Sequence, residues 1–401
     1  MEINETSLGG ELLSKRAIRV LLVDDQPIIA EAIRRMLESE PDISFYYCQN
    51  PLNAMAMASE VSPTVILQDL VMPDVDGLTL VKYFRANQAT KNMPLVVLSS
   101  KEDSATKYKA FENGANDYMV KLPDKLEVLA RIRYHSNAYN VYCERNVAME
   151  NLQKSQQHLK QELEQAEQYV ESLLPKKLNN DVIATDWVFK SSTELGGDCF
   201  GYEWIDTENF CIFLLDVCGH GVGAALLSVS VMNVLRSQSL AGVDFKRPSQ
   251  VLSALNNAFE MEKQNNMYFT LWYGVYNIKT RKLSFSSGGH PPAILIDSDG
   301  VSANELTTRG MIIGGMPDMN FSEAEINVNP LSRLYVFSDG VYEIQRTDTK
   351  SMMCFDDFKA ELISPSVCNK SKLQCMLDFS ARVQNSSQFE DDYSMCEIIF
   401  K

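Results

Sequence analysis

The stretch IRVLLVDDQ (residues 18–26) decides the fold of the first part of this 401-residue chain. Its first six residues are almost all apolar and branched, and two aspartates follow at once. A short, nearly continuous apolar run is typical of a strand that is buried on both faces of a parallel sheet. Two later runs of this kind, Val65–Gln68 and Leu95–Ser99, also lead directly into polar residues. The functional residues are therefore expected at the ends of these strands.

Amphipathic helical patterns separate the apolar runs, at Ile28–Ser39, Leu78–Asn87 and Ser104–Asn113. This repeated strand–helix–strand order predicts an α/β doubly wound, flavodoxin-like domain over residues 17–137, after a flexible N-terminus at 1–16. In such a sheet, ligands bind beyond the carboxyl ends of the strands.

Three aspartates are expected to meet at that edge of the sheet. Asp24 and Asp25 end the first strand, Asp69 ends the third, and Lys121 follows a further short apolar run. Crowded carboxylates repel one another unless a hard cation lies between them, and oxygen ligands of this kind suit Mg²⁺. The pattern predicts a Mg²⁺ site that receives a phosphoryl group. The alternative for Asp24 and Asp25 is a pair of helix-capping residues.

The runs VLLVDDQ (20–26), QDLVMPDVDG (68–77), VVLSS (96–100) and DYMVKLP (117–123) resemble the receiver domain of two-component response regulators. The resemblance implies that Asp69 is the phosphoacceptor and that Asp24 and Asp25 bind Mg²⁺ with the carbonyl of Val71. It also implies roles for three switch residues. Ser99 would bind the phosphoryl oxygens, Lys121 would pair with their charge, and Tyr118 would turn inward on activation. The pattern departs from the family at Leu122, where receivers usually have proline.

Residues 138–176 predict a helical linker, because they contain neither glycine nor proline before Pro175. Apolar residues in this segment are spaced three or four residues apart, with one gap of seven, which is close to the heptad repeat of a coiled coil. They are Ala148, Leu152, Leu159, Leu163, Ala166, Val170 and Leu173. The pattern predicts a parallel homodimer, and the alternative is a single amphipathic helix folded back on a domain.

In residues 177–401 the apolar pattern changes to a period of two, which is typical of strands, with helical patterns in two longer segments. The expected strands are Asn209–Val217, Met267–Asn277, Lys282–Ser287, Leu334–Ser338 and Ser394–Phe400, and the expected helices are His220–Leu240 and Ser249–Glu262. This pattern predicts an α+β layered β-sandwich.

Aspartates again follow or precede strands in this second part. They are Asp198 in GGDCFGY, Asp216 in LLDVCGHG, Asp339 in VFSDGVYE, and Asp391 with Asp392 in EDDYS. The glycines beside them let the backbone approach a metal closely. Two divalent ions held by such carboxylates can share a water and align it for in-line attack on phosphorus. The pattern therefore predicts hydrolysis of a phosphate monoester.

The ordered motifs GGDCFGY (196–202), LDVCGHGVGAAL (215–226), MYFTLWYGVYN (267–277), FSDGVYE (337–343) and DDYSM (391–395) resemble the metal-dependent PPM/PP2C protein phosphatases. The similar branch is that of bacterial sporulation and stress regulators that act on anti-sigma-factor antagonists. The resemblance implies two Mn²⁺ or Mg²⁺ ions and a catalytic set in which Asp216, assisted by the Val217 carbonyl, bridges both ions. Asp198 would bind one ion, and Asp339 and Asp391 the other.

Two residues of this part carry further expectations. Many relatives have an aspartate where this chain has Gly201, so two metals are expected and a third site is doubtful. His220 follows Gly219 beside the expected bridging ligand and could act as a general acid, or it could fix the turn by hydrogen bonds.

Together the two resemblances imply a response regulator whose aspartyl phosphorylation controls a serine/threonine protein phosphatase. A cognate histidine kinase and a phosphorylated STAS-type anti-sigma-factor antagonist are the expected partners. The alternative is a catalytically inactive adaptor that binds a protein. A net charge of −16 argues against nucleic-acid or anionic-membrane partners. The chain has no apolar signal core and no run of roughly 20 apolar residues, which predicts a soluble, cytoplasmic protein.

Overall fold

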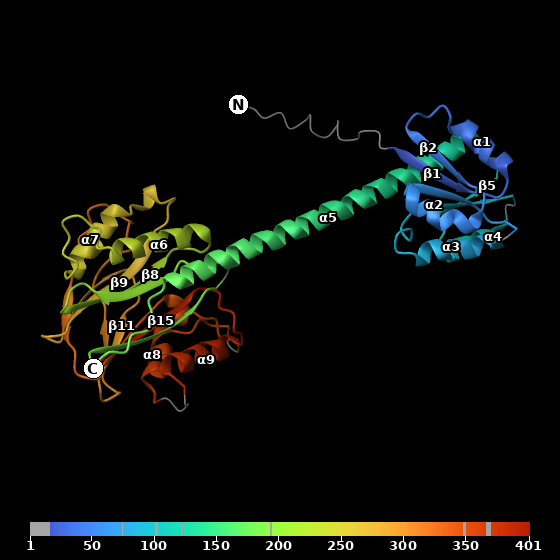
Figure 1. Cartoon of the computed structure of the whole chain (residues 1–401). Coiled ribbons are helices and arrows are strands. Elements are labelled where there is room, and N and C mark those ends of the chain that lie inside the picture. The colour runs from blue at the N-terminus through green and yellow to red at the C-terminus, as the bar shows by residue number, and fades with distance from the viewer. Residues whose placement is uncertain are drawn as a thin grey trace. The chain divides into compact units, whose positions relative to one another are not determined.

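The computed structural model of the chain describes residues 17–73, 75–100, 103–121, 123–192, 195–347, 350–365 and 370–401. The expectations for residues 1–16 and for Leu122 lie outside these ranges. The chain divides into two compact units, and the boundary between Ser155 and Gln156 falls within one long helix (Figure 1). No described helix is long and apolar enough to cross a membrane.

The first unit is a parallel sheet of five strands in the order β2-β1-β3-β4-β5. The strands are β1 (Ile18–Val23), β2 (Ile43–Cys48), β3 (Val65–Asp69), β4 (Leu95–Ser99) and β5 (Asp117–Val120). The helices are α1 (Pro27–Leu37), the 3₁₀ turn η1 (Pro51–Asn53), α2 (Ala54–Val61), α3 (Gly77–Ala86), α4 (Ser104–Glu112) and the long α5 (Lys125–Leu173). The doubly wound α/β fold predicted from the sequence is confirmed.

Helices cover both faces of this sheet. On one face, Ala54, Leu80 and Phe84 of α2 and α3 pack on the strands, and on the other face Ile33 of α1 and Ile132 of α5 do so. Because all the strands run parallel, their carboxyl ends lie along one edge, where the predicted polar residues are.

Helix α5 is a single helix of 49 residues that begins in the first unit and ends in the second. Residues 144–162 are exposed throughout, including the seam residues Leu152 and Leu159. The later seam residues Leu163, Ala166 and Val170 are partly buried, and Leu173 packs on the core of the second unit. The predicted linker therefore continues the last receiver helix. Its middle part is open to solvent, whereas its last turns are partly covered.

The second unit contains two antiparallel sheets, in the orders β13-β10-β9-β8-β7 and β12-β11-β14-β15-β6. The first sheet comprises β7 (Cys199–Trp204), β8 (Asn209–Val217), β9 (Phe269–Asn277), β10 (Lys282–Gly288) and β13 (Ala324–Asn327). The second comprises β6 (Ile183–Lys190), β11 (Ala293–Ile296), β12 (Ala303–Leu306), β14 (Arg333–Phe337) and β15 (Tyr393–Phe400). The helices are α6 (Val222–Arg236), α7 (Pro248–Ala258), α8 (Phe355–Ile363) and α9 (Lys372–Gln384), with the 3₁₀ turns η2 (Met261–Lys263) and η3 (Asp339–Val341).

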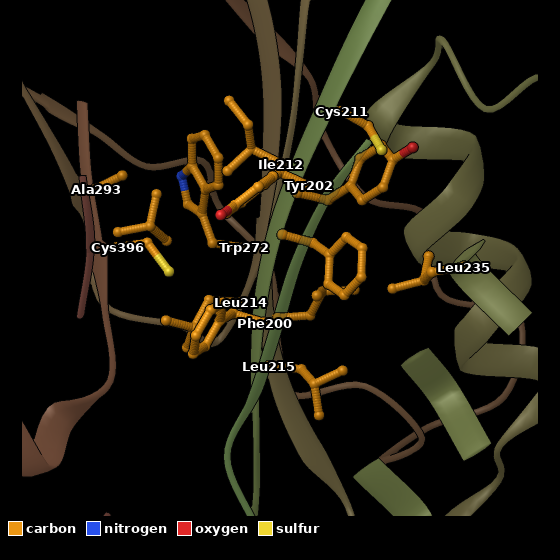
Figure 2. Packing of buried hydrophobic residues seen from close by; sticks show 14 of the residues in the cluster. Phe200, Tyr202, Cys211, Ile212, Leu214, Leu215, Leu235, Trp272, Ala293 and Cys396 are labelled. Atoms are coloured by element: carbon orange, nitrogen blue, oxygen red, sulfur yellow. The ribbon is translucent and has the colours of Figure 1, made fainter. Parts of the chain in front are cut away.

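Figure 1 shows α6 and α7 on the outer side of the sheet with β8 and β9, and α8 and α9 on the outer side of the sheet with β11 and β15. The predicted α+β layered sandwich is confirmed. Side chains alternate between the two faces of β8 and fill the core on both sides. Figure 2 shows Ile212 of β8, with Trp272 of the neighbouring β9, on the side of Ala293 and Cys396, and Leu215 of β8 on the side of Leu235 of α6. One strand thus packs both against the second sheet and against a helix.

The first helix of this unit begins two residues later than predicted. Gly219 and Gly221 have φ angles of 84° and 94°, which lie in the left-handed region, so the helix cannot include them. The segment of His220 is consequently a loop that leads from the end of β8 into α6.

Candidate functional sites

The structure brings the three receiver aspartates together at the carboxyl edge of the first sheet. Carboxylate oxygens of Asp24, Asp25 and Asp69 all lie within 4.8 Å of one another. Asp24 and Asp69 are completely buried, and Asp25 is partly buried. Lys121 Nζ donates a hydrogen bond of 2.7 Å to Asp69 Oδ2 and lies 3.0 Å from Asp24 Oδ2. The lysine that follows β5 thus joins the ends of β1 and β3.

The electrostatics of this cluster fit a divalent cation. Burial raises the pKa of Asp24, and the negative charge of Asp69 adds to the effect, while the Gln26 N–H and Lys121 oppose it. Burial alone would lower the pKa of Lys121, but its hydrogen bonds to Asp69 and Asp24 raise it overall. One lysine cannot neutralise three carboxylates, so the site has an excess of hard, anionic oxygen ligands such as Mg²⁺ prefers.

The other predicted receiver residues lie around this cluster. The backbone N–H of Val71 donates to Asp69 Oδ1 at 3.2 Å, so the Val71 peptide is beside the expected phosphoacceptor. Ser99 ends β4 and is 5% exposed, and its carbonyl accepts a 2.7 Å hydrogen bond from the Lys121 N–H. The Tyr118 ring is also 5% exposed, with Lys107 Nζ lying 5.2 Å from the ring centroid. The tyrosine therefore points inward in this structure.

The four aspartates of the second unit come from the ends of both sheets. Asp198 precedes β7 and Asp216 lies near the end of the neighbouring β8, whereas Asp339 follows β14 and Asp391 precedes the neighbouring β15. Among the described residues, no three of these carboxylates are as closely spaced as those of the receiver cluster. The second group is the looser of the two.

Mutual repulsion shows that these four carboxylates nevertheless lie near one another. Burial, with the charges of Asp339 and Asp391 adding to its effect, raises the pKa of Asp216 to about 8. Burial and the charge of Asp391 raise the pKa of Asp339 to about 6. Burial, followed by the charges of Asp216 and Asp392, holds the pKa of Asp198 well above its usual range. Within the described residues, no lysine or arginine forms an ion pair with any of the four.

The backbone around Asp198 also fits a metal ion. Both carboxylate oxygens of Asp198 are buried and accept no hydrogen bond within the described part of the chain. A Cβ at the preceding Gly197 would lie 2.6 Å from the carbonyl oxygen of Val217, so only glycine lets these two loops approach. A buried carboxylate without partners is costly. A divalent cation would satisfy it, with the neighbouring Val217 carbonyl as a further oxygen ligand.

The structure shows what surrounds Gly201 and His220, and also His290, which lies in the sequence GGHPP. A Cβ at Gly201 would lie 2.3 Å from the Phe213 ring, so packing excludes the aspartate that many relatives have there. His220 is exposed, and its charge lowers the pKa of Asp391, which places it beside the cluster. His290 is buried, its Nδ1 lies 2.8 Å from Thr270 Oγ1, and burial lowers its pKa to about 3.

Two further acidic residues act on these four carboxylates, and neither was predicted from the sequence to be a metal ligand. Glu343 raises the pKa of Asp216 and Asp339, and Asp392 raises that of Asp198 and Asp216. Both lie inside motifs that were recognised, SDGVYE and EDDYS, but their letters alone do not distinguish a ligand from a supporting residue. A cavity of about 420 Å³ borders Asp391 and Glu343 and extends to Arg346 and Lys350.

Both parts of the chain match known protein families. Residues 20–133 match the family model of the response regulator receiver domain, and residues 206–400 match that of stage II sporulation protein E (SpoIIE). The chain is 28% identical over 232 residues to the phosphoserine phosphatase RsbP of Bacillus subtilis, covering 58% of this chain and 56% of that protein. It is 25% identical over 249 residues to the phosphoserine phosphatase RsbU of the same organism, covering 61% of this chain and 72% of that protein.

Among solved structures, the SiaA-PP2C domain of Pseudomonas aeruginosa is similar in fold, with a TM-score of 0.53. The two are 17% identical, and the match covers 62% of this chain and 99% of that domain. This similarity shows the fold alone. The chain spans little more than half of the length of RsbP, so the relatives' names do not by themselves give its activity.

Proposed function

We propose that this chain, which carries a response regulator receiver domain and a SpoIIE-type PP2C phosphatase domain, hydrolyses phosphoserine or phosphothreonine on another protein under receiver control. The observation that carries the proposal is the convergence of Asp198, Asp216, Asp339 and Asp391, whose pKa values are raised by burial and by neighbouring carboxylates and which no described lysine or arginine neutralises. We place the receiver at residues 17–137, the helical linker at 138–176 and the phosphatase domain at 177–401.

In the phosphatase domain, Asp216 would contact both ions, Asp198 one of them, and Asp339 and Asp391 the other, with the Val217 carbonyl assisting. When bound, two Mn²⁺ or Mg²⁺ ions supply an activated water at neutral pH. His220, which is exposed and whose charge acts on Asp391, would give a proton to the leaving alkoxide. The cavity that borders Asp391 is a place for the peptide that flanks the phosphoryl group.

In the receiver, Asp69 would accept the phosphoryl group from a cognate histidine kinase. Asp24, Asp25 and the Val71 carbonyl would hold Mg²⁺ beside it. Lys121, which already contacts Asp69, and Ser99 at the end of the next strand would bind the phosphoryl oxygens, with Tyr118 reporting the change. A phosphorylated anti-sigma-factor antagonist of the STAS type is the proposed substrate, on the basis of the resemblance to the sporulation and stress branch of the family.

Turnover measurements test the enzyme and its control. Purified protein with Mn²⁺ is expected to dephosphorylate a phosphoserine peptide, and beryllofluoride, which mimics a phosphorylated aspartate, is expected to change the rate. Asp69→Ala should remove the response to beryllofluoride and leave the basal rate. No turnover under any of these conditions, with retained binding of a phosphorylated STAS protein, would favour the adaptor alternative.

The middle of α5 is proposed to pair with a second copy of the chain. Met149, Leu152 and Leu159 are exposed large apolar residues, and Met149, Leu152, Gln156 and Leu159 follow a spacing of three and four. Leu152→Glu with Leu159→Glu is expected to convert a dimer into a monomer in sedimentation experiments, because four charges would enter the seam. Gln161→Glu, on the opposite face of the helix, is the control. A wild-type monomer at micromolar concentration would contradict the proposal.

A further inference from the structure

Asp392 directly follows the candidate ligand Asp391, but its side chain is turned toward the protein. It is 4% exposed. Its Oδ1 accepts hydrogen bonds from the backbone N–H of Ser192 at 2.9 Å and from Ser192 Oγ at 3.2 Å. Its Oδ2 accepts from the backbone N–H of Asp198 at 3.3 Å. The Asp392 carboxylate thus binds the segment before β7 at two points, Ser192 and Asp198.

The backbone of Asp392 is fixed to another part of the site. Its carbonyl oxygen accepts a hydrogen bond of 3.1 Å from Ser338 Oγ, and Ser338 directly precedes Asp339. The Ser338 hydroxyl also accepts from the Ser394 N–H at 3.3 Å. A buried, hydrogen-bonded serine therefore joins the end of β14 to the start of β15.

Two glycines make these contacts possible. A Cβ at Gly196 would lie 2.1 Å from Asp392 Oδ2, and a Cβ at Gly340 would lie 2.3 Å from the Asp392 carbonyl oxygen. Neither glycine has a positive φ angle, so neither is needed for backbone conformation. The space that they leave is filled by Asp392. This close fit explains Gly196 in GGDCF and Gly340 in SDGVYE without reference to a metal.

We propose that Asp392 is a positioning residue that holds Asp198, Asp339 and Asp391 in one geometry, and that it is not itself a metal ligand. The inference rests on the proposed function for the identity of the ligands. The three segments that carry them come from two different sheets, and Asp392 is bonded to the other two while it continues the third. Groups that orient metal ligands in this way typically change metal affinity or activity about 10- to 100-fold when they are removed.

Asp392→Asn is the sharpest variant, because asparagine has nearly the same shape. One of its two side-chain positions becomes an NH₂ group, which cannot accept the N–H of Asp198 or of Ser192. Gly196→Ala is a second variant that keeps the carboxylate but displaces it. Asp299→Asn is a matched control, since Asp299 also accepts two backbone N–H groups and a serine hydroxyl, in the turn between β11 and β12.

Calorimetric titration of the full chain with Mn²⁺ tests the proposal in a background in which Asp25→Asn and Asp69→Asn weaken the receiver site. Asp392→Asn and Gly196→Ala are each expected to bind the same number of ions as the parent with about 10- to 100-fold lower affinity, and Asp299→Asn to match the parent. Turnover of p-nitrophenyl phosphate should fall with the affinity. The double variant should be little worse than either single one.

Unchanged Mn²⁺ affinity in Asp392→Asn would overturn the proposal, and so would the loss of one bound ion, which would make Asp392 a ligand. If Asp392→Asn does not fold, Gly196→Ala with unchanged affinity has the same consequence. A parent protein that binds Mn²⁺ without any turnover would refute the proposed function, while the affinities of the variants would still decide the role of Asp392.

Discussion

Asp216→Asn is expected to lower the Mn²⁺-dependent turnover of a phosphoserine peptide by about 1,000-fold, or about 4 kcal/mol of activation free energy. Asp216 experiences the charges of both Asp339 and Asp391, and its own charge raises the pKa of Asp198. It is therefore the carboxylate that connects the two sides of the site. An amide in its place keeps the shape but removes the anionic oxygen that two cations would share.

The measurement is the initial rate at saturating Mn²⁺, with wild-type protein and Asp299→Asn as references. Labelling of Asp69 by a small phosphodonor should be unchanged, because the receiver is a separate compact unit with its own core. A variant that keeps more than a tenth of the wild-type rate would show that Asp216 does not bridge the metals. Equal, negligible rates in the wild-type protein and in Asp216→Asn would refute the proposed phosphatase activity.

The parts of the fold that could be predicted from sequence are those with continuous apolar runs. β1, β4 and β8 have the predicted bounds. The edge strands β12 and β13 were not predicted, because each has only four residues and most of them are partly or fully exposed. Helix α8 was missed as well, since its nine residues FDDFKAELI bury only Phe358 and Leu362.

The candidate sites divide in the same way. Parallel strands bring their carboxyl ends to one edge, so a cluster of Asp24, Asp25 and Asp69 followed from strand order alone. In the second unit the aspartates come from two sheets that pack face to face, and no spacing rule places the end of β8 beside the end of β14. Only the family resemblance joined them. Asp392 could not be separated from Asp391 by sequence, because the distinction lies in which carboxylate accepts backbone N–H groups.

In the absence of divalent ions, the phosphatase unit is expected to lose stability as the pH rises from about 5 to 8. An unperturbed aspartate has a pKa of about 3.9, whereas the folded-state pKa is about 8 for Asp216 and about 6 for Asp339. Between these limits the folded protein retains protons that the unfolded chain has released. Stability therefore falls with rising pH across this range.

Tryptophan fluorescence during thermal unfolding in EDTA measures this effect in the right unit, because Trp187, Trp204 and Trp272 all belong to the second unit. The midpoint should decrease from pH 5 to 8, and Asp216→Asn should flatten the decrease by removing one of the carboxylates whose pKa is raised in the folded protein. Mn²⁺ should raise the midpoint most at pH 8, since metal binding requires deprotonated carboxylates. A midpoint in EDTA that rises or stays constant over this range would mean that Asp198, Asp216, Asp339 and Asp391 do not form a buried cluster of carboxylates, and would remove the basis for a shared metal centre.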